Sequence, residues 1–222
     1  MKTIGIIGGM GPEATNHLIL KIIKGFEDAG QKVRPSILVD FVPVSIETES
    51  NLILKNETGN FVELLTNSAE RLEKGGADFI IIACNSVHLF VNDVIKSVNI
   101  PVVSVIDEVS KLNLNQSGII ATEFTIKNNL FGNKFEKPNV KTQKSINRII
   151  DELVKGNVTN NNNINILEKL LDNWVQSGTK NCILGCSEMQ LLTKLWNKWS
   201  NKINFIDTMD VLAKTSVKNL LN

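Results

Sequence analysis

The chain has 222 residues, 42% of them hydrophobic and 21% charged, a composition typical of a folded globular protein rather than a disordered or fibrous one. Its 24 basic and 23 acidic side chains leave a formal net charge of +1, which gives no reason to expect nucleic acid or an anionic membrane as a partner. The longest apolar run, Phe79–Cys84, is too short to cross a bilayer, and three cysteines, an odd number, predict a reduced, cytoplasmic protein.

Short β-branched runs alternate along the chain with longer amphipathic ones, a pattern typical of an α/β protein with parallel sheets. We predict, in chain order, strands at Thr3–Ile7, Ser36–Asp40, Phe79–Ala83, Val102–Val105, Ser117–Ile120, Asn181–Leu184 and Asn204–Ile206. We predict helices between them at Pro12–Asp28, Asn60–Lys74, Gln143–Lys155 and Ile164–Gln176. The polar, asparagine-rich run Thr159–Asn165 predicts a surface loop.

The two halves of the chain resemble each other. Gly76–Cys84 and Gly178–Cys186 both read as a glycine, an apolar strand and a cysteine, and both pairs of glycines and cysteines stand 102 residues apart. We therefore expect two pseudo-symmetric α/β lobes, residues 1–105 and 106–208, each a small parallel sheet flanked by helices. We expect the active site in the cleft between the lobes, and a C-terminal helix at about 209–222 that packs back on the first lobe.

Cys84 and Cys186 each follow an apolar strand and precede a helix, at the end of a parallel sheet where ligands bind. A helix N-terminus lowers the pKa of a nearby thiol from about 8.5, which would make a thiolate available near neutral pH. A buried structural cysteine is the plainer interpretation, and we adopt it for Cys182. Two cysteines at equivalent positions of a repeat favour a functional pair instead.

Two thiols that face each other across a cleft suit the inversion of a carbon centre, which needs a base on one face and an acid on the other. A disulfide between them is disfavoured in a reducing compartment, and the spacing of the cysteines and two histidines does not indicate a metal site. His88, four residues after Cys84, could act as a base toward that thiol or orient its loop, and we favour the supporting role.

The turn Gly9–Ala14 matches the weaker form of the dinucleotide fingerprint, G-x-G-x-x-A, and Asp40 could then hold a ribose. This interpretation predicts a nucleotide-dependent oxidoreductase. The same turn can instead cradle a substrate carboxylate at a helix start. The cysteine repeat makes the carboxylate interpretation the stronger one.

Three motifs in order, Ile6–Pro12, Ala83–His88 and Leu184–Glu188, resemble those of the aspartate/glutamate racemase family, and the resemblance covers essentially the whole chain. It implies racemisation of a small-molecule amino acid with no cofactor such as pyridoxal phosphate, by a two-lobed homodimer. It implies Cys84 and Cys186 as the acid/base pair, and we assign His88 and Glu188 supporting roles. The candidate substrate-binding residues are Met10, Asn85, Ser86, Thr122, Thr125, Lys155 and Ser187.

The sequence departs from the family pattern where aspartate-specific members carry an arginine. The stretch Pro43–Glu49 has none, and Phe124 replaces the glycine of a T-x-G-T turn. Lys155 could still pair with a second carboxylate, which keeps aspartate and glutamate as substrates. Glu47 and Glu49 would repel an acidic substrate if they face inward. We therefore predict a racemase that is not confined to aspartate.

Other activities remain open at this stage. A hydantoin racemase, a maleate isomerase and an arylmalonate decarboxylase all use a similar cysteine geometry. A non-catalytic protein that binds a small ligand is a further alternative, because two intact cysteines do not prove catalysis.

Overall fold

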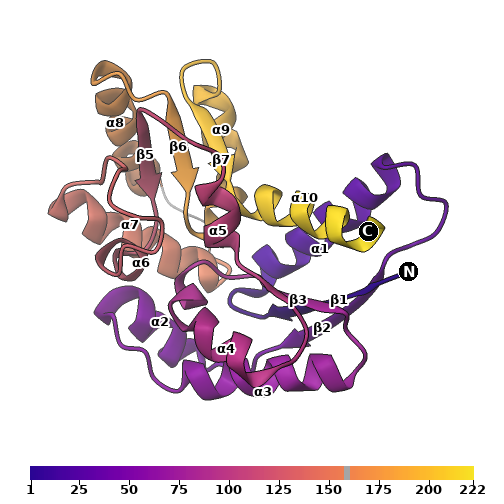
Figure 1. Ribbon diagram of the computed structural model, residues 1–222. Helices are drawn as coiled ribbons and strands as arrows, with labels where there is room; N and C mark the ends of the chain where they lie inside the picture. Colours follow the sequence, from indigo (N-terminus) through magenta and orange to yellow (C-terminus); the bar gives the residue numbers. More distant parts are fainter. Residues whose placement is uncertain (158–160) are drawn as a thin grey trace.

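The computed structural model describes residues 1–157 and 161–222 and contains two parallel sheets (Figure 1). The first sheet has the strand order β2-β1-β3-β4. Its strands are β1 (Thr3–Gly8), β2 (Ser36–Phe41), β3 (Phe79–Ile82) and β4 (Val102–Val103). The second sheet has the order β5-β6-β7, with β5 (Ser117–Ile120), β6 (Asn181–Leu184) and β7 (Asn204–Asp207). Every strand pair is parallel, as the sequence predicts.

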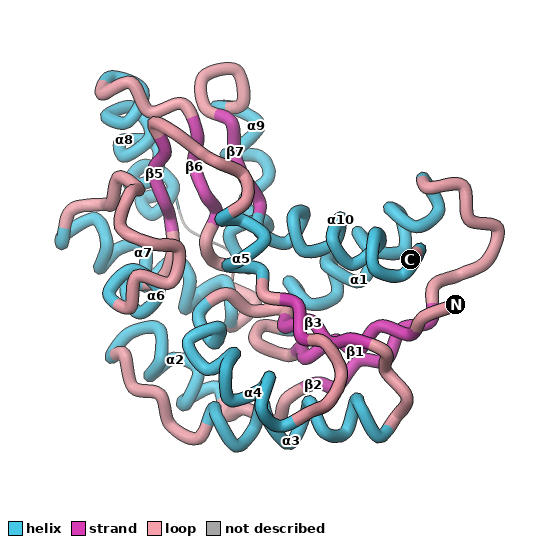
Figure 2. Tube along the Cα trace, viewed as in Figure 1, coloured by secondary structure: helices cyan, strands magenta, loops and turns pink. Residues whose placement is uncertain are grey.

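Helices cover both faces of the first sheet (Figure 2). The helices in the first half of the chain are α1 (Pro12–Asp28), α2 (Ile46–Lys55), α3 (Phe61–Lys74), the 3₁₀ helix η1 (Ser86–Phe90), α4 (Val91–Ser97) and α5 (Val105–Ser110). The helices in the second half are α6 (Glu123–Lys127), α7 (Val140–Val154), α8 (Asn161–Gln176), the 3₁₀ helix η2 (Ser187–Leu192), α9 (Thr193–Trp199) and α10 (Thr208–Leu221).

The central strands are apolar throughout because both of their faces are buried. On β1, Ile4 and Ile6 pack in one cluster with side chains of α1 and α10, whereas Ile7 packs on the opposite face with side chains of α3. Successive side chains of a strand point to opposite faces, so the isoleucines of β1 pack in two cores, one on each face of the sheet. The carboxyl end of the sheet is thereby held between two helical layers.

Several predicted boundaries are confirmed, among them α1, which begins with Pro12 at its first turn. The prediction of a strand through Val105 is wrong. The strand β4 ends at Val103 because the Ser104 hydroxyl accepts a hydrogen bond from the Asp107 N–H (3.3 Å) and caps α5.

The predicted loop Thr159–Asn165 is also wrong where the structure describes it. Helix α8 begins at Asn161, and residues 158–160 lie outside the described part of the chain. The helix buries Leu167, Leu170, Leu171 and Trp174, at the three- and four-residue spacing of one helical face. This packing outweighs the moderate helix propensity of asparagine.

The last helix connects the two sheets. Helix α10 follows β7 of the second sheet but packs on α1 and α5, beside the first sheet (Figure 1). Lys21 of α1 pairs with Asp207 and, at 2.6 Å, with Asp210. The division into lobes at residues 105 and 106 stays a prediction. Among the described residues, no helix is both long and apolar enough to cross a membrane.

Candidate active site

Cys84 and Cys186 line one cavity, although they come from different sheets. Cys84 stands two residues after the end of β3, and Cys186 stands two residues after the end of β6. Neither thiol is bonded to another cysteine. The carboxyl ends of the two sheets therefore bring the repeated cysteines to the same place.

The cavity is closed in this structure. Its polar lining consists of Glu49, Cys84, Ser86, Thr122, Cys186 and Glu188, and the rest is mostly apolar. It has about 20 Å³ of free volume, enough for about one water molecule and too little for an amino acid. A substrate can enter only when the surrounding elements separate.

Glu188 is anchored beside Cys186 by three donors. The Cys186 thiol (3.2 Å) and the Ser187 hydroxyl (2.8 Å) both donate hydrogen bonds to its Oε2. The Gly11 N–H donates to its Oε1 at 2.8 Å. The glycine-rich turn after β1 thus binds a carboxylate of the protein itself, from the opposite half of the chain.

His88 holds the loop that carries Cys84. Its Nδ1 donates to the Cys84 carbonyl oxygen (2.7 Å), and its Nε2 accepts from the Val105 N–H (3.3 Å). Burial lowers the pKa of this imidazole to about 4, so the ring is neutral. Main-chain groups thus occupy both ring nitrogens. This geometry fits a role in orienting the Cys84 loop, and it leaves no ring nitrogen free to act as a base toward the Cys84 thiol.

Three hydroxyl groups link the two halves next to the thiols. Ser86, Thr122 and Thr125 lie 3.0 Å from one another, and the Thr122 hydroxyl also caps α6 by accepting from the Thr125 N–H (3.1 Å). Ser86 and Thr122 reach the cavity, and Thr125 supports them from outside its lining.

The remaining candidate residues divide between the cavity and its surroundings. Met10 lines the cavity. Asn85 is buried, and its amide donates to the Thr208 hydroxyl (3.0 Å), which itself donates to the Leu184 carbonyl (3.0 Å). Lys155 does not reach the cavity lining, because its amine pairs with Asp151 at 2.6 Å.

The sequence leaves open whether Glu49 faces inward, and the structure shows that it does. Its side chain is 8% exposed and lines the cavity, whereas Glu47 is exposed. Burial and the nearby charges of Glu188 and Asp151 raise the pKa of Glu49 to about 8. The signal was the apolar spacing of Leu52 and Ile53 three and four residues after it, which places Glu49 on the buried face of α2.

The prediction of a lowered thiol pKa is wrong for this closed structure. Burial, together with the Glu188 carboxylate, raises the pKa of Cys84 to about 12, although the amides of Ser86 and Val87 act in the opposite direction. The same two causes raise the pKa of Cys186 well above its ordinary value. Loss of water around the thiols outweighs the effect of the helix start.

The groups that would bind a dinucleotide are already engaged. The Gly9 N–H donates to the Thr15 hydroxyl (3.0 Å), and the Gly11 N–H is bound to Glu188. Asp40, the candidate ribose ligand, makes a two-point contact with Arg71 (3.1 and 2.6 Å). These contacts disfavour the nucleotide interpretation of the turn.

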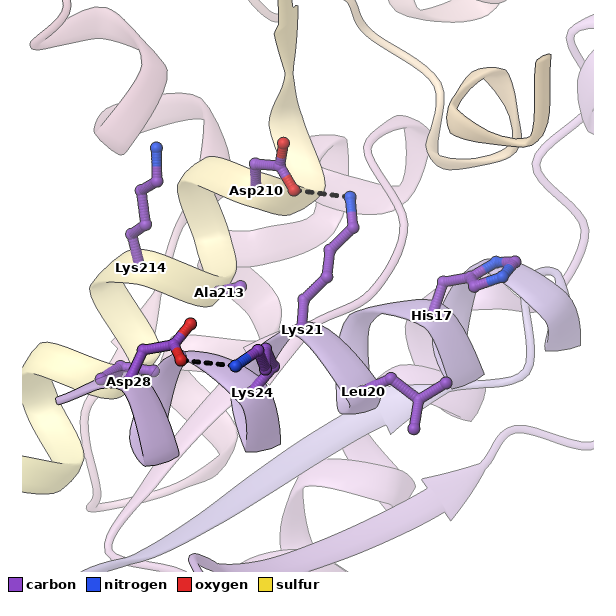
Figure 3. Close-up of a pocket in the computed structure, with 10 residues that line it drawn as sticks. His17, Leu20, Lys21, Lys24, Asp28, Asp210, Ala213 and Lys214 are labelled. Atoms are coloured by element: carbon purple, nitrogen blue, oxygen red, sulfur yellow. Dashed lines mark hydrogen bonds and ion pairs between the residues drawn. The ribbon is translucent and has the colours of Figure 1, made fainter. Parts of the chain in front are cut away.

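A larger cavity of about 540 Å³ lies between α1 and α10 (Figure 3). Four of its charged side chains pair with each other, Lys21 with Asp210 (2.6 Å) and Lys24 with Asp28 (2.5 Å). No cysteine lines it. Within residues 1–157 and 161–222, no cluster of three or more His, Cys, Asp or Glu side chains is arranged to hold a metal ion. The cysteine cavity therefore remains the candidate active site.

The chain is similar over nearly its whole length to known racemases. Residues 7–215 match the model of a family described as Asp/Glu/Hydantoin racemase. The chain is 22% identical to the broad specificity amino-acid racemase RacX of Bacillus subtilis (strain 168), over 98% of both chains. An aspartate racemase homologue from Pyrococcus horikoshii OT3 has 27% identity and a TM-score of 0.77 over 100% of both chains. Picrophilus torridus aspartate racemase has 20% identity and a TM-score of 0.76, over 99% of this chain and 94% of the other.

Proposed function

The chain belongs to the Asp/Glu/Hydantoin racemase family, and we propose that it racemises an amino acid by moving the α-proton between Cys84 and Cys186. One observation carries the proposal: two free thiols, at equivalent positions of two sheets, line the same cavity. A racemase needs an acid and a base on opposite faces of one carbon, and this pair can supply both.

In the proposed reaction, one cysteine is a thiolate and takes the α-proton from one face of the substrate. The electron pair left on the α-carbon is then protonated from the other face by the thiol of the second cysteine, which becomes the thiolate. The charge of the pair is the same before and after, so the roles exchange in the reverse direction. No outside acid, base or oxidant is consumed.

The active thiolate must be generated from a thiol that the closed cavity keeps protonated. The Glu188 carboxylate accepts a hydrogen bond from the Cys186 thiol and is suitably placed to receive its proton. The α-ammonium of a bound amino acid adds a positive charge, which favours the thiolate and lowers the thiol pKa. Substrate binding thus offsets the burial that raises this pKa.

The substrate's α-carboxylate would bind near the hydroxyls of Ser86 and Thr122, which line the cavity beside the thiols. Asn85 and Ser187 directly follow the two cysteines in the sequence. Asn85 is bonded to Thr208 and Ser187 to Glu188, and these bonds hold the loops that carry the cysteines. We assign Thr125, His88 and Met10 to the support of this arrangement.

The test is α-proton exchange. The purified protein is incubated in D₂O with each L-amino acid in turn, without added cofactor. We expect the D-isomer together with deuterium at the α-carbon. Racemisation that requires added pyridoxal phosphate would contradict the proposal. Binding without exchange would instead support a non-catalytic ligand-binding protein, and hydantoins, maleate and arylmalonates in the same panel test the related activities.

The homodimer and the cytoplasmic location are also proposals. Light scattering of the purified protein tests the first. The three free thiols support the second, because such thiols persist in a reducing compartment.

A further inference from the structure

Glu49 is a buried carboxyl group with no partner in the described structure. Its side chain is 8% exposed and faces the cavity that holds both thiols. Within residues 1–157 and 161–222, no hydrogen bond or ion pair reaches its carboxylate, although Ser45 and Ser50 on the same segment are both bonded elsewhere. A buried ionisable group that lacks a partner is costly, so Glu49 has a binding capacity that a ligand could satisfy.

The charge around Glu49 is negative. Glu188 lines the same cavity, and Asp151 is close enough to influence Glu49. Lys155 is bound to Asp151 at 2.6 Å and offsets the charge of that carboxylate, so the uncompensated acidic neighbour of Glu49 is Glu188. A second carboxylate on a substrate would therefore meet repulsion here.

Of the two acidic groups in the cavity, Glu49 has the larger acceptor capacity left for a substrate side chain. Glu188 already accepts three hydrogen bonds, from Gly11, Cys186 and Ser187. The walls beside Glu49 are apolar and come from α2 and α7, with Leu52, Ile53, Ile150 and Val154. These side chains suit a hydrocarbon stem, and the carboxylate suits a cationic group at its end.

We propose that Glu49 selects amino acids whose aliphatic side chain ends in an ammonium group, such as lysine and ornithine, over aspartate and glutamate. The inference rests on the proposed racemase function and names its substrate class. A bound ammonium favours the ionised form of Glu49, which the closed cavity disfavours, and the resulting ion pair gives Glu49 the partner that it lacks where water screens the attraction little. The absence of an arginine from Pro43–Glu49 fits the same selection.

The experiment compares three substrates in the α-proton exchange assay: L-lysine, L-norleucine and L-glutamate. Lysine and norleucine share an aliphatic stem, and only lysine carries the terminal charge. In the unaltered protein we expect kcat/KM for lysine to exceed that for glutamate by at least about 100-fold, because a buried unpaired charge is strongly disfavoured.

Two matched variants locate the effect. Glu49→Gln removes the charge with little change in shape, and we expect the lysine-to-norleucine ratio of kcat/KM to fall at least about tenfold. Glu47→Gln makes the same change in charge on an exposed position of the same helix, and the ratio should keep its value.

The outcomes distinguish failure of this inference from failure of the proposed racemase function. Exchange that favours glutamate over lysine, or an unchanged ratio in Glu49→Gln, overturns the role of Glu49 while the racemase proposal stands. The absence of exchange with every amino acid overturns the racemase proposal and this inference together. A Glu49→Gln protein that fails to fold still leaves the substrate profile of the unaltered protein as the deciding result.

Discussion

The Cys186 thiol donates a hydrogen bond to the Glu188 carboxylate two residues further along the chain, with Sγ 3.2 Å from Oε2. The same oxygen accepts from Ser187, and the other carboxylate oxygen is bound to the Gly11 N–H. One thiol of the pair thus has its own proton acceptor, held by groups from both halves of the chain. This arrangement makes the two ends of the proposed proton transfer unequal.

Glu188→Gln should slow proton removal by Cys186 and leave proton removal by Cys84 less affected. Because the equilibrium constant of racemisation is one, kcat/KM stays equal in the two directions. The difference appears in the α-deuterium isotope effect, which should rise for the enantiomer whose proton faces Cys186, since that step becomes more rate-limiting. Measurement with both α-deuterated enantiomers checks this. Equal isotope effects would reduce Glu188 to a structural role.

Cys84→Ala and Cys186→Ala should each lower racemisation at least about 100-fold, because each removes one of the two proton-transfer groups. Serine at either position should also fail, since a hydroxyl is a much weaker acid than a thiol. Chiral chromatography of the products measures the loss. The matched control is Cys182→Ala, which removes a thiol buried within β6 and outside the cavity lining, and which should keep racemising. An active Cys84→Ala protein would exclude the two-thiol mechanism.

The neutral, buried His88 should make the protein less stable in acid. Its pKa is about 4 in the folded protein and about 6.5 when unfolded, so between these values only the unfolded chain takes up a proton. The free energy of unfolding should therefore fall as the pH drops from about 6.5 to 4, by up to about 3 kcal/mol. Urea unfolding of the protein and of the His88→Asn variant, from pH 7.5 to 4.5, isolates the contribution of His88 to the pH dependence of the free energy of unfolding. Parallel curves for the two proteins would contradict it.

Thr208→Val should destabilise the connection between the two sheets. The Thr208 hydroxyl accepts from Asn85 and donates to the Leu184 carbonyl, and valine keeps the shape but leaves both groups unpaired. The expected loss in the free energy of unfolding is about 1–3 kcal/mol, measured by chemical denaturation. Thr66→Val, in which an exposed bond to the carbonyl of Val62 is removed, serves as control and should cost under about 0.5 kcal/mol. Equal losses of unfolding free energy in the two variants would show that the buried Thr208 bonds stabilise the fold no more than the exposed Thr66 bond.

Patterns within a few residues were sufficient to predict much of this fold. Proline marks the start of α1, and short, mostly apolar segments mark β5 and β6, and the bounds of these three elements agree with the prediction. The repeat also indicated that Cys84 and Cys186 belong together. Family membership and the α/β fold are confirmed by the comparisons.

What the sequence did not reveal depends on contacts between distant residues. Gly11 and Glu188 are 177 positions apart, so no local motif could show that the glycine-rich turn binds a carboxylate of the chain. The raised thiol pKa results from burial by both halves. Helix α2 was not predicted, so the spacing of Leu52 and Ile53 that places Glu49 on its buried face was not recognised. The contacts and burial of the side chains in the site can therefore be determined only from the folded structure.

The small free volume of the cavity has a kinetic consequence. Ser50 of α2 donates to Asp151 of α7 at 2.6 Å, so the helices that wall the cavity are bonded to each other when it is closed. A substrate binds only the fraction of molecules in which this wall is open, and its apparent dissociation constant is the intrinsic one divided by that fraction. The divisor is the same for every amino acid admitted by the same opening. It weakens all measured affinities alike and cancels from any ratio between two substrates.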